Sequence, residues 1–250
     1  MLALSSDVAR ADHSWTNPNT GNPYHWARTS NPFTLKLGDN VSSAWDSYLV
    51  TSSADWSAST VLDTSIVTGQ GRKNCSAVTG TAQVCNKKYG FNGWLGVAEI
   101  WVSGDHIVKG RTRMNDTYFN TSTYNSPAWR QFVMCQEVGH LFGLDHQDED
   151  FNNPDIIPET CMDYTRVPAG NGHPNAHDYD QLEAIYAHLD STTTVASAAA
   201  SSRFGFDGDD DSEGRDFGQS IRARKDGRAN VFIKELRGGT KVITHVFWAD

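Results

Sequence analysis

Apolar and polar residues alternate over several short stretches of the chain, which is the pattern of half-buried β-strands. The strands predicted on this basis lie at residues 33–37, 61–67, 94–102 and 106–114. The last two flank the turn Ser103-Gly104-Asp105 and therefore predict a hairpin. Residues 69–90 are rich in glycine, serine, threonine and asparagine, and we expect a loop there.

Apolar residues at helical spacing predict three helices, which cover residues 42–56, 126–142 and 178–189. Ser126-Pro127 supplies an N-cap and a first helical residue for the second helix, and Gly143 ends it. Residues 147–176 show no clear periodicity, and a loop of this length inside a compact domain is usually functional.

Strands and helices that mix along the chain indicate an α+β fold. The 250 residues suffice for one sizeable domain and a small appendage. We assign the domain to residues 12–190, a low-complexity linker to 191–203 and a small β-rich unit to 204–250. Within this last unit, residues 230–236 and 241–248 alternate around a Gly-Gly turn and predict a second hairpin.

The N-terminal segment and the composition indicate a secreted protein. Residues 1–11 join a short apolar start to Ala9-Arg10-Ala11, an A-x-A-like cleavage site. They resemble the remnant of a secretory signal peptide, and a plain N-terminal tail is the alternative. No apolar run reaches the roughly 20 residues that cross a membrane. The formal net charge of −9 argues against nucleic acid as a partner.

Four cysteines, an even number, agree with two disulfide bonds in a secreted protein. A Cys75–Cys85 bond would close a short loop, and a Cys135–Cys161 bond would tie the second helix to a later segment. Four cysteines allow three pairings, of which we favour this one, and buried free thiols are the alternative.

The second predicted helix ends in the segment Gln136 to His146, which brings possible metal ligands together. Residues four apart share one helix face, so Gln136 and His140 point the same way, with Glu137 beside them. Gly143 lets the chain leave the helix, and His146 can then return to the same point. Two imidazoles, a further ligand and an open position are typical of catalytic zinc, and an adjacent glutamate can serve as general base.

These residues resemble the signature H-E-x-x-H-x-x-G-x-x-H of the metzincin zinc peptidases. Glu137, His140, Gly143 and His146 match four of its five fixed positions. Downstream, Cys161-Met162-Asp163-Tyr164 resembles the Met-turn of the family. The order of elements is most similar to the matrixin-like secreted peptidases. The resemblance implies a twisted mixed sheet, an active-site helix, a Met-turn and a C-terminal helix.

The resemblance also implies roles for the matching residues. Glu137 would act as general base and acid, and His140 and His146 would bind Zn²⁺. Met162 would form the apolar floor beneath the metal. Tyr164 would bind zinc or stabilise the oxyanion, as tyrosine does at this position in the astacin and serralysin branches, or else be a packed core aromatic.

The sequence departs from the signature at Gln136, where the family has a histidine. An amide oxygen is a weaker zinc ligand than imidazole because it is neutral and less basic. Three outcomes follow. Gln136 ligates weakly through its oxygen, or Tyr164, Asp145 or a water takes the position, or the site is inactive.

Other polar residues give weaker signals. An acidic run after the motif is expected to be a solvated loop, with a structural Ca²⁺ site as the alternative. Its members are Asp145, Asp148, Glu149 and Asp150. Asp178 resembles the matrixin aspartate that hydrogen-bonds near the Met-turn. Five histidines have no partner at ligand spacing: His13, His25, His106, His188 and His245.

We therefore predict a secreted zinc metalloendopeptidase that hydrolyses peptide bonds in a peptide or protein substrate. The alternative is an inactive, peptidase-like module that binds peptides or proteins, because Gln136 replaces a zinc ligand. A main role for residues 204–250 in adhesion or targeting is a third reading. We expect residues 106–114 to form the sheet edge above the active-site helix, where an extended substrate would add as a strand.

Overall fold

The computed structural model of the protein describes residues 13–71, 75–150, 159–196 and 216–249. In this part of the chain the strands are β1 (His25–Trp26), β2 (Phe33–Asn40), β3 (Leu62–Thr68), β4 (Ala82–Lys87), β5 (Trp94–Ser103), β6 (His106–Asn115), β7 (Gln219–Ala223), β8 (Ala229–Glu235) and β9 (Lys241–Trp248). The α-helices are α1 (Asp46–Trp56), α2 (Asp116–Phe119), α3 (Pro127–His140) and α4 (Ala176–Ile185). Strands and helices mix along the chain, which confirms the predicted α+β class.

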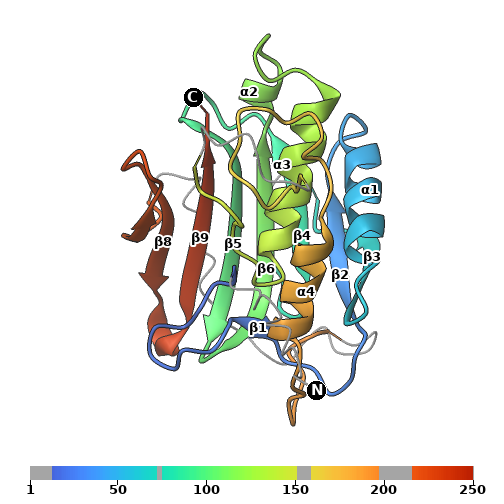
Figure 1. The fold of residues 1–250 in the computed structure, drawn as a ribbon, viewed down its shortest axis with the longest axis vertical. Helices are drawn as coiled ribbons and strands as arrows, with labels where there is room; N and C mark the ends of the chain where they lie inside the picture. Colours follow the sequence, from blue (N-terminus) through green and yellow to red (C-terminus); the bar gives the residue numbers. More distant parts are fainter. Residues whose placement is uncertain (1–12, 72–74, 151–158, 197–215, 250) are drawn as a thin grey trace, which may run out of the picture.

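One mixed sheet runs through the molecule in the order β3-β2-β4-β6-β5-β9-β8-β7, with β1 paired to β6. The strands β3, β2, β4 and β6 are parallel to one another. From β5 onward each strand is antiparallel to its neighbours. Helices α1, α3 and α4 lie together in front of this sheet in Figure 1, and α3 packs against β5 and β6. The main hydrophobic core fills the space between these two layers.

The predicted hairpins and helices are present near their expected bounds, but three strands, β1, β4 and β7, and the short helix α2 were missed. β4 lies inside the expected loop at 69–90, and β7 lies in the C-terminal unit. β4 (AQVCNK) is flanked by polar residues, yet it is buried between β2 and β6. Its strand conformation depends on these two neighbours, which a local pattern does not contain.

The predicted substrate-binding edge is wrong. β6 is an inner strand, paired to β4 on one side and to β5 on the other. β5 is covered in turn, because β9 pairs with it from Trp94 to Val102. The prediction failed because two neighbours were not foreseen, the missed strand β4 and the C-terminal strand β9.

The C-terminal strands extend the sheet of the N-terminal part of the chain through the β5–β9 pairing (Figure 1). The division of the chain at residues 191–203 stays a prediction. The predicted signal remnant at residues 1–11 lies outside the described residues. No helix in the described part of the chain is long and apolar enough to span a membrane.

Helix α3 owes its bounds to local residues. Ser126 caps it, since its side chain accepts a hydrogen bond from the Trp129 amide, and Pro127 opens it. At Gly143 the chain takes φ 92°, where a Cβ would lie 2.2 Å from the Tyr24 carbonyl oxygen. Both the positive φ and the close approach therefore require glycine at this position.

Both favoured disulfides are present, Cys75–Cys85 and Cys135–Cys161, so all four cysteines are paired. The second bond joins the buried side of α3 to the segment that carries Met162. It therefore fixes two parts of the chain on which the site depends.

Replacing Cys135 and Cys161 by alanine should lower the free energy of unfolding by about 3 kcal/mol, because the crosslink limits the unfolded chain over a separation of 26 residues. The matched pair Cys75→Ala and Cys85→Ala spans 10 residues and should lower it by roughly 1 kcal/mol less. Urea unfolding measures both. Unchanged stability of the first variant would contradict a structural role for that bond.

Candidate metal centre

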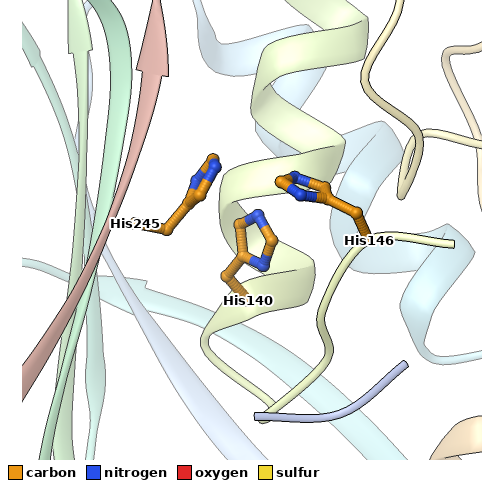
Figure 2. A group of neighbouring side chains, drawn as sticks. All are labelled: His140, His146 and His245. Atoms are coloured by element: carbon orange, nitrogen blue, oxygen red, sulfur yellow. The ribbon is translucent and has the colours of Figure 1, made fainter. Parts of the chain in front are cut away.

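Three histidines from separate segments meet beside helix α3. His140 lies in the last turn of α3, His146 in the segment after Gly143, and His245 on β9. Their ligand atoms lie within 4.8 Å of one another. Figure 2 shows the three rings facing a common space. The sequence predicted two of these residues, and His245 is the third.

The hydrogen bonds of His140 and His146 leave one nitrogen of each ring available. Nδ1 of His140 donates to the Leu144 carbonyl oxygen at 2.9 Å. Nδ1 of His146 donates to Oε1 of Glu149 at 3.3 Å. In each ring Nε2 therefore carries the lone pair, which is the outer-shell arrangement typical of metal-binding histidines.

The centre contains several buried polar atoms that have no hydrogen-bond partner among the described residues. These atoms are Nε2 of His140, Nε2 of His146, both ring nitrogens of His245, both carboxylate oxygens of Glu137 and Oε1 of Gln136. Leaving so many buried polar atoms unsatisfied is costly, and a metal ion bound by the ring nitrogens would lower this cost. Imidazole is a favourable zinc ligand, so the donor set fits zinc.

Burial also sets the charge of the centre. It lowers the pKa of His140 and of His245 well below the ordinary value, and the nearby imidazoles add to the effect. Both rings are therefore neutral at neutral pH, which is the form that binds metals. Burial raises the pKa of Glu137 well above its usual range.

Glu137 lies between the cluster and the sheet. Its Oε2 is 3.6 Å from Nδ1 of His245. A Cβ added at Gly96 on β5 would lie 2.5 Å from Oε1 of Glu137, so only glycine leaves room for the carboxylate there. The predicted general base thus adjoins the cluster, and its catalytic role stays a prediction.

Gln136 ties α3 to the turn that carries Met162. Its Nε2 donates to the Cys161 carbonyl oxygen at 2.9 Å and to the Asp163 carbonyl oxygen at 2.6 Å. The Met162 sulfur packs against α3, since a Cβ at Gly139 would lie 2.5 Å from it. Gln136 as a metal ligand stays a prediction that concerns its Oε1 atom.

Tyr164 faces the C-terminal strand. Its hydroxyl oxygen accepts a hydrogen bond from the Trp248 amide at 3.0 Å, and its ring stacks on Phe247 with centroids 4.7 Å apart. The ring also meets His146 edge-on at 5.2 Å. Burial raises the pKa of Tyr164, so the hydroxyl stays protonated. Its predicted catalytic role stays a prediction.

The acidic run is solvated only in part, because Asp145 is buried and the other three acidic residues are half-exposed. Asp145 is buried and takes a two-pronged ion pair from Arg222, whose guanidinium also lies 2.9 Å from Oε1 of Glu149. Lys225 pairs with Asp150 at 3.2 Å. Both cations come from the C-terminal unit, and its contact with the acidic run could not be predicted from local sequence patterns. Because these carboxylates face cations, the described residues give the alternative, a structural Ca²⁺ site, no support.

Asp178 fastens the Met162 segment to helix α4, as its likeness to the matrixin aspartate suggests. Its Oδ2 accepts hydrogen bonds from the Thr160 hydroxyl and from the Asn175 amide, the latter at 2.8 Å. The Asn175 side chain completes a capping box at the start of α4.

The C-terminal hairpin encloses the centre. His140, Glu137 and His245 are fully buried, and His146 is 6% exposed. β9 pairs with β5 from Lys241 to Trp248 and so occupies the sheet edge beside α3. In this conformation β5 has no free edge for a peptide, because β9 pairs with it, and the three histidines are almost completely buried.

A local signal for His245 is visible in the sequence. On β9 the residues Ile243, His245 and Phe247 share one face by strand alternation, and the flanking two join the main core. A histidine on an apolar inward face is a candidate for a buried role. Ligand-spacing rules missed it because it lies far from the motif along the chain.

Comparison with known proteins leaves the function to be argued from the site. No protein-family model and no curated protein matches the chain. Among solved structures, the chain is similar to high choriolytic enzyme 1, a hatching enzyme zinc-protease from Oryzias latipes (medaka fish). The identity is 13%, the TM-score is 0.40, and the overlap covers 70% of this chain and 99% of that chain. A likeness of this size carries no argument about activity.

Arg222→Met should lower the free energy of unfolding by about 3 kcal/mol, because Asp145 then stays buried without its cation. Hydrogen exchange should also rise in β7 and β8. Lys234→Met is the matched control, since Lys234 pairs with the exposed Asp216 and should change stability little. Equal, small effects of the two substitutions in urea unfolding would contradict the role given to Arg222.

Proposed function

We propose that the protein is a zinc-dependent peptidase whose metal is held by His140, His146 and His245. The observation that carries this proposal is the convergence of three buried imidazoles with unpartnered nitrogens beside the buried Glu137 carboxylate. Three histidine ligands and an open fourth position are typical of catalytic zinc. This ligand set replaces the one expected from the motif, with His245 in the role left open by Gln136.

Zinc in this position would polarise a peptide carbonyl and lower the pKa of a bound water. Glu137 is the carboxylate that adjoins His245, so it is the residue to hold a proton and pass it to the leaving amine. Glu149 orients His146 through Nδ1, and Leu144 orients His140. Gln136 and Met162 hold helix α3 against the turn at residues 161–163. Tyr164 is the second candidate for a catalytic role.

Substrate access requires movement of the hairpin β8–β9. A peptide that adds to a sheet needs an unpaired strand, and β9 occupies that edge of β5. The conformation in which β9 pairs with β5 is therefore the closed form of the peptidase. Arg222 on β7 pairs with Asp145 and Glu149, which follow α3. These ion pairs hold the C-terminal unit in the closed form.

A second candidate function is supported by the same enclosure. Complete burial of Glu137 and His140 favours a metal centre that stabilises an inactive, peptidase-like binding module. Secretion belongs to both proposals and is supported by the two disulfide bonds, which persist in oxidising compartments. The matrixin-like subtype stays a prediction from the motif.

His245→Ala should weaken zinc binding by more than about 100-fold, the upper range for loss of an outer-shell partner, because it removes a direct ligand. Competition with a chromophoric chelator measures the affinity. His173→Ala is the matched control, since His173 is exposed and pairs with Asp55 elsewhere. Gln136→Ala should reduce the affinity less than His245→Ala. The reverse order would make Gln136 the third ligand and overturn the three-histidine site.

Glu137→Gln should retain zinc and lose peptide hydrolysis, because the amide keeps the shape of the side chain but cannot take up a proton. Cleavage of a mixed peptide library, with and without chelator, measures activity. Chelator-sensitive cleavage by the unaltered chain that disappears in Glu137→Gln supports the peptidase. A zinc-loaded, folded chain that cleaves no peptide of the library would support the second candidate.

A further inference from the structure

A second histidine cluster lies outside the metal centre, where β1, the start of β6 and the chain after α4 meet (Figure 1). His25 comes from β1, His106 opens β6, and His188 and Asp190 follow α4. All four line a hollow of about 350 Å³. His25 is 3% exposed and His188 is 51% exposed, so the cluster reaches from the interior to solvent.

The donor atoms of this cluster have the spacing of metal ligands. Nε2 of His188 lies 3.1 Å from Nε2 of His25. Oδ1 of Asp190 lies 3.6 Å from Nε2 of His25 and 3.7 Å from Nε2 of His188. Tetrahedral zinc with bonds of about 2.0–2.1 Å keeps its ligands about 3.3 Å apart. The three atoms therefore approximate one face of such a tetrahedron.

The hydrogen bonds around His25 turn its lone pair toward the cluster. Nδ1 of His25 donates to the Pro23 carbonyl oxygen at 2.8 Å, so Nε2 is the unprotonated nitrogen. Burial, together with the neighbouring histidines, lowers the pKa of His25, although Asp190 and the Pro23 carbonyl oppose this. A neutral imidazole with an oriented lone pair is the form that binds metals.

Asp190 is oriented in the same way. Its Oδ2 accepts hydrogen bonds from the Arg28 amide at 3.1 Å and from the Arg28 guanidinium at 2.9 Å. Its Oδ1 therefore faces the histidines, where His106 also approaches it at 3.2 Å. Burial opposes ionisation, but Arg28 and the histidines lower the pKa of Asp190, so the carboxylate is charged at neutral pH.

We propose that His25, His188 and Asp190 form a second site for a divalent transition-metal ion such as zinc, with its remaining position toward the hollow and His106. Two imidazoles and a carboxylate suit such ions better than calcium or magnesium, which prefer oxygen ligands. A metal here would fasten β1 to the chain after α4. The segment before β1 also contacts the metal centre, since Trp15 stacks on His140 with ring centroids 4.9 Å apart.

Zinc stoichiometry tests this proposal on the full chain. The protein is stripped with chelator, dialysed against Zn²⁺ alone and analysed for bound zinc. We expect two zinc ions per unaltered chain, one for His188→Ala and one for the pair His140→Ala and His146→Ala. His106→Ala should bind two, the second about 10- to 100-fold more weakly, as for an outer-shell partner. His173→Ala is the control and should bind two.

The two sites fail separately in this experiment. One zinc per chain that survives His188→Ala but is lost in the His140 and His146 pair overturns the second site and leaves the metal centre intact. One zinc per chain that is lost in His188→Ala but survives the pair His140→Ala and His146→Ala overturns the metal centre and supports the second site. No bound zinc overturns both. Circular dichroism checks the fold, and His188→Gln replaces His188→Ala if that variant does not fold.

Discussion

The pairing of β9 with β5 is the interaction on which the rest of the structure depends. It joins the C-terminal strands to the sheet of the N-terminal part and places His245 opposite Ala98. From there His245 reaches His140 and His146 on the other side of the core. The same ladder covers the sheet edge beside α3, so one set of backbone hydrogen bonds both completes the metal centre and closes it.

The closed centre buries polar groups that have no hydrogen-bond partner among the described residues, which costs free energy unless a metal ion binds among them. Three imidazoles, the Glu137 side chain and several unpartnered polar atoms lie together in the buried interior. A metal ion held by the three histidines would satisfy the ring nitrogens that bind it, and the surrounding ion pairs between Arg222 and the acidic run would keep the hairpin in place. Metal binding and attachment of the C-terminal unit are therefore expected to stabilise each other.

The predictable parts of the site are those whose residues lie close together in one short segment of the sequence. Helix α3, its cap, Gly143 and the pair His140 and His146 follow from local spacing, and the structure brings the two histidines together. His245 joins them only through the β5–β9 pairing, which is a long-range contact. Strand β4 and the cluster at His25 depend on tertiary neighbours in the same way, so no local period indicates them.

A crystal structure of the zinc-loaded chain, with anomalous scattering recorded at the zinc absorption edge, tests the central claim most directly. We expect a zinc peak about 2.0–2.1 Å from Nε2 of His140, Nε2 of His146 and a ring nitrogen of His245, with β9 still paired to β5. Zinc bound by His140 and His146 with Oε1 of Gln136 in third place, and His245 turned away, would contradict the account.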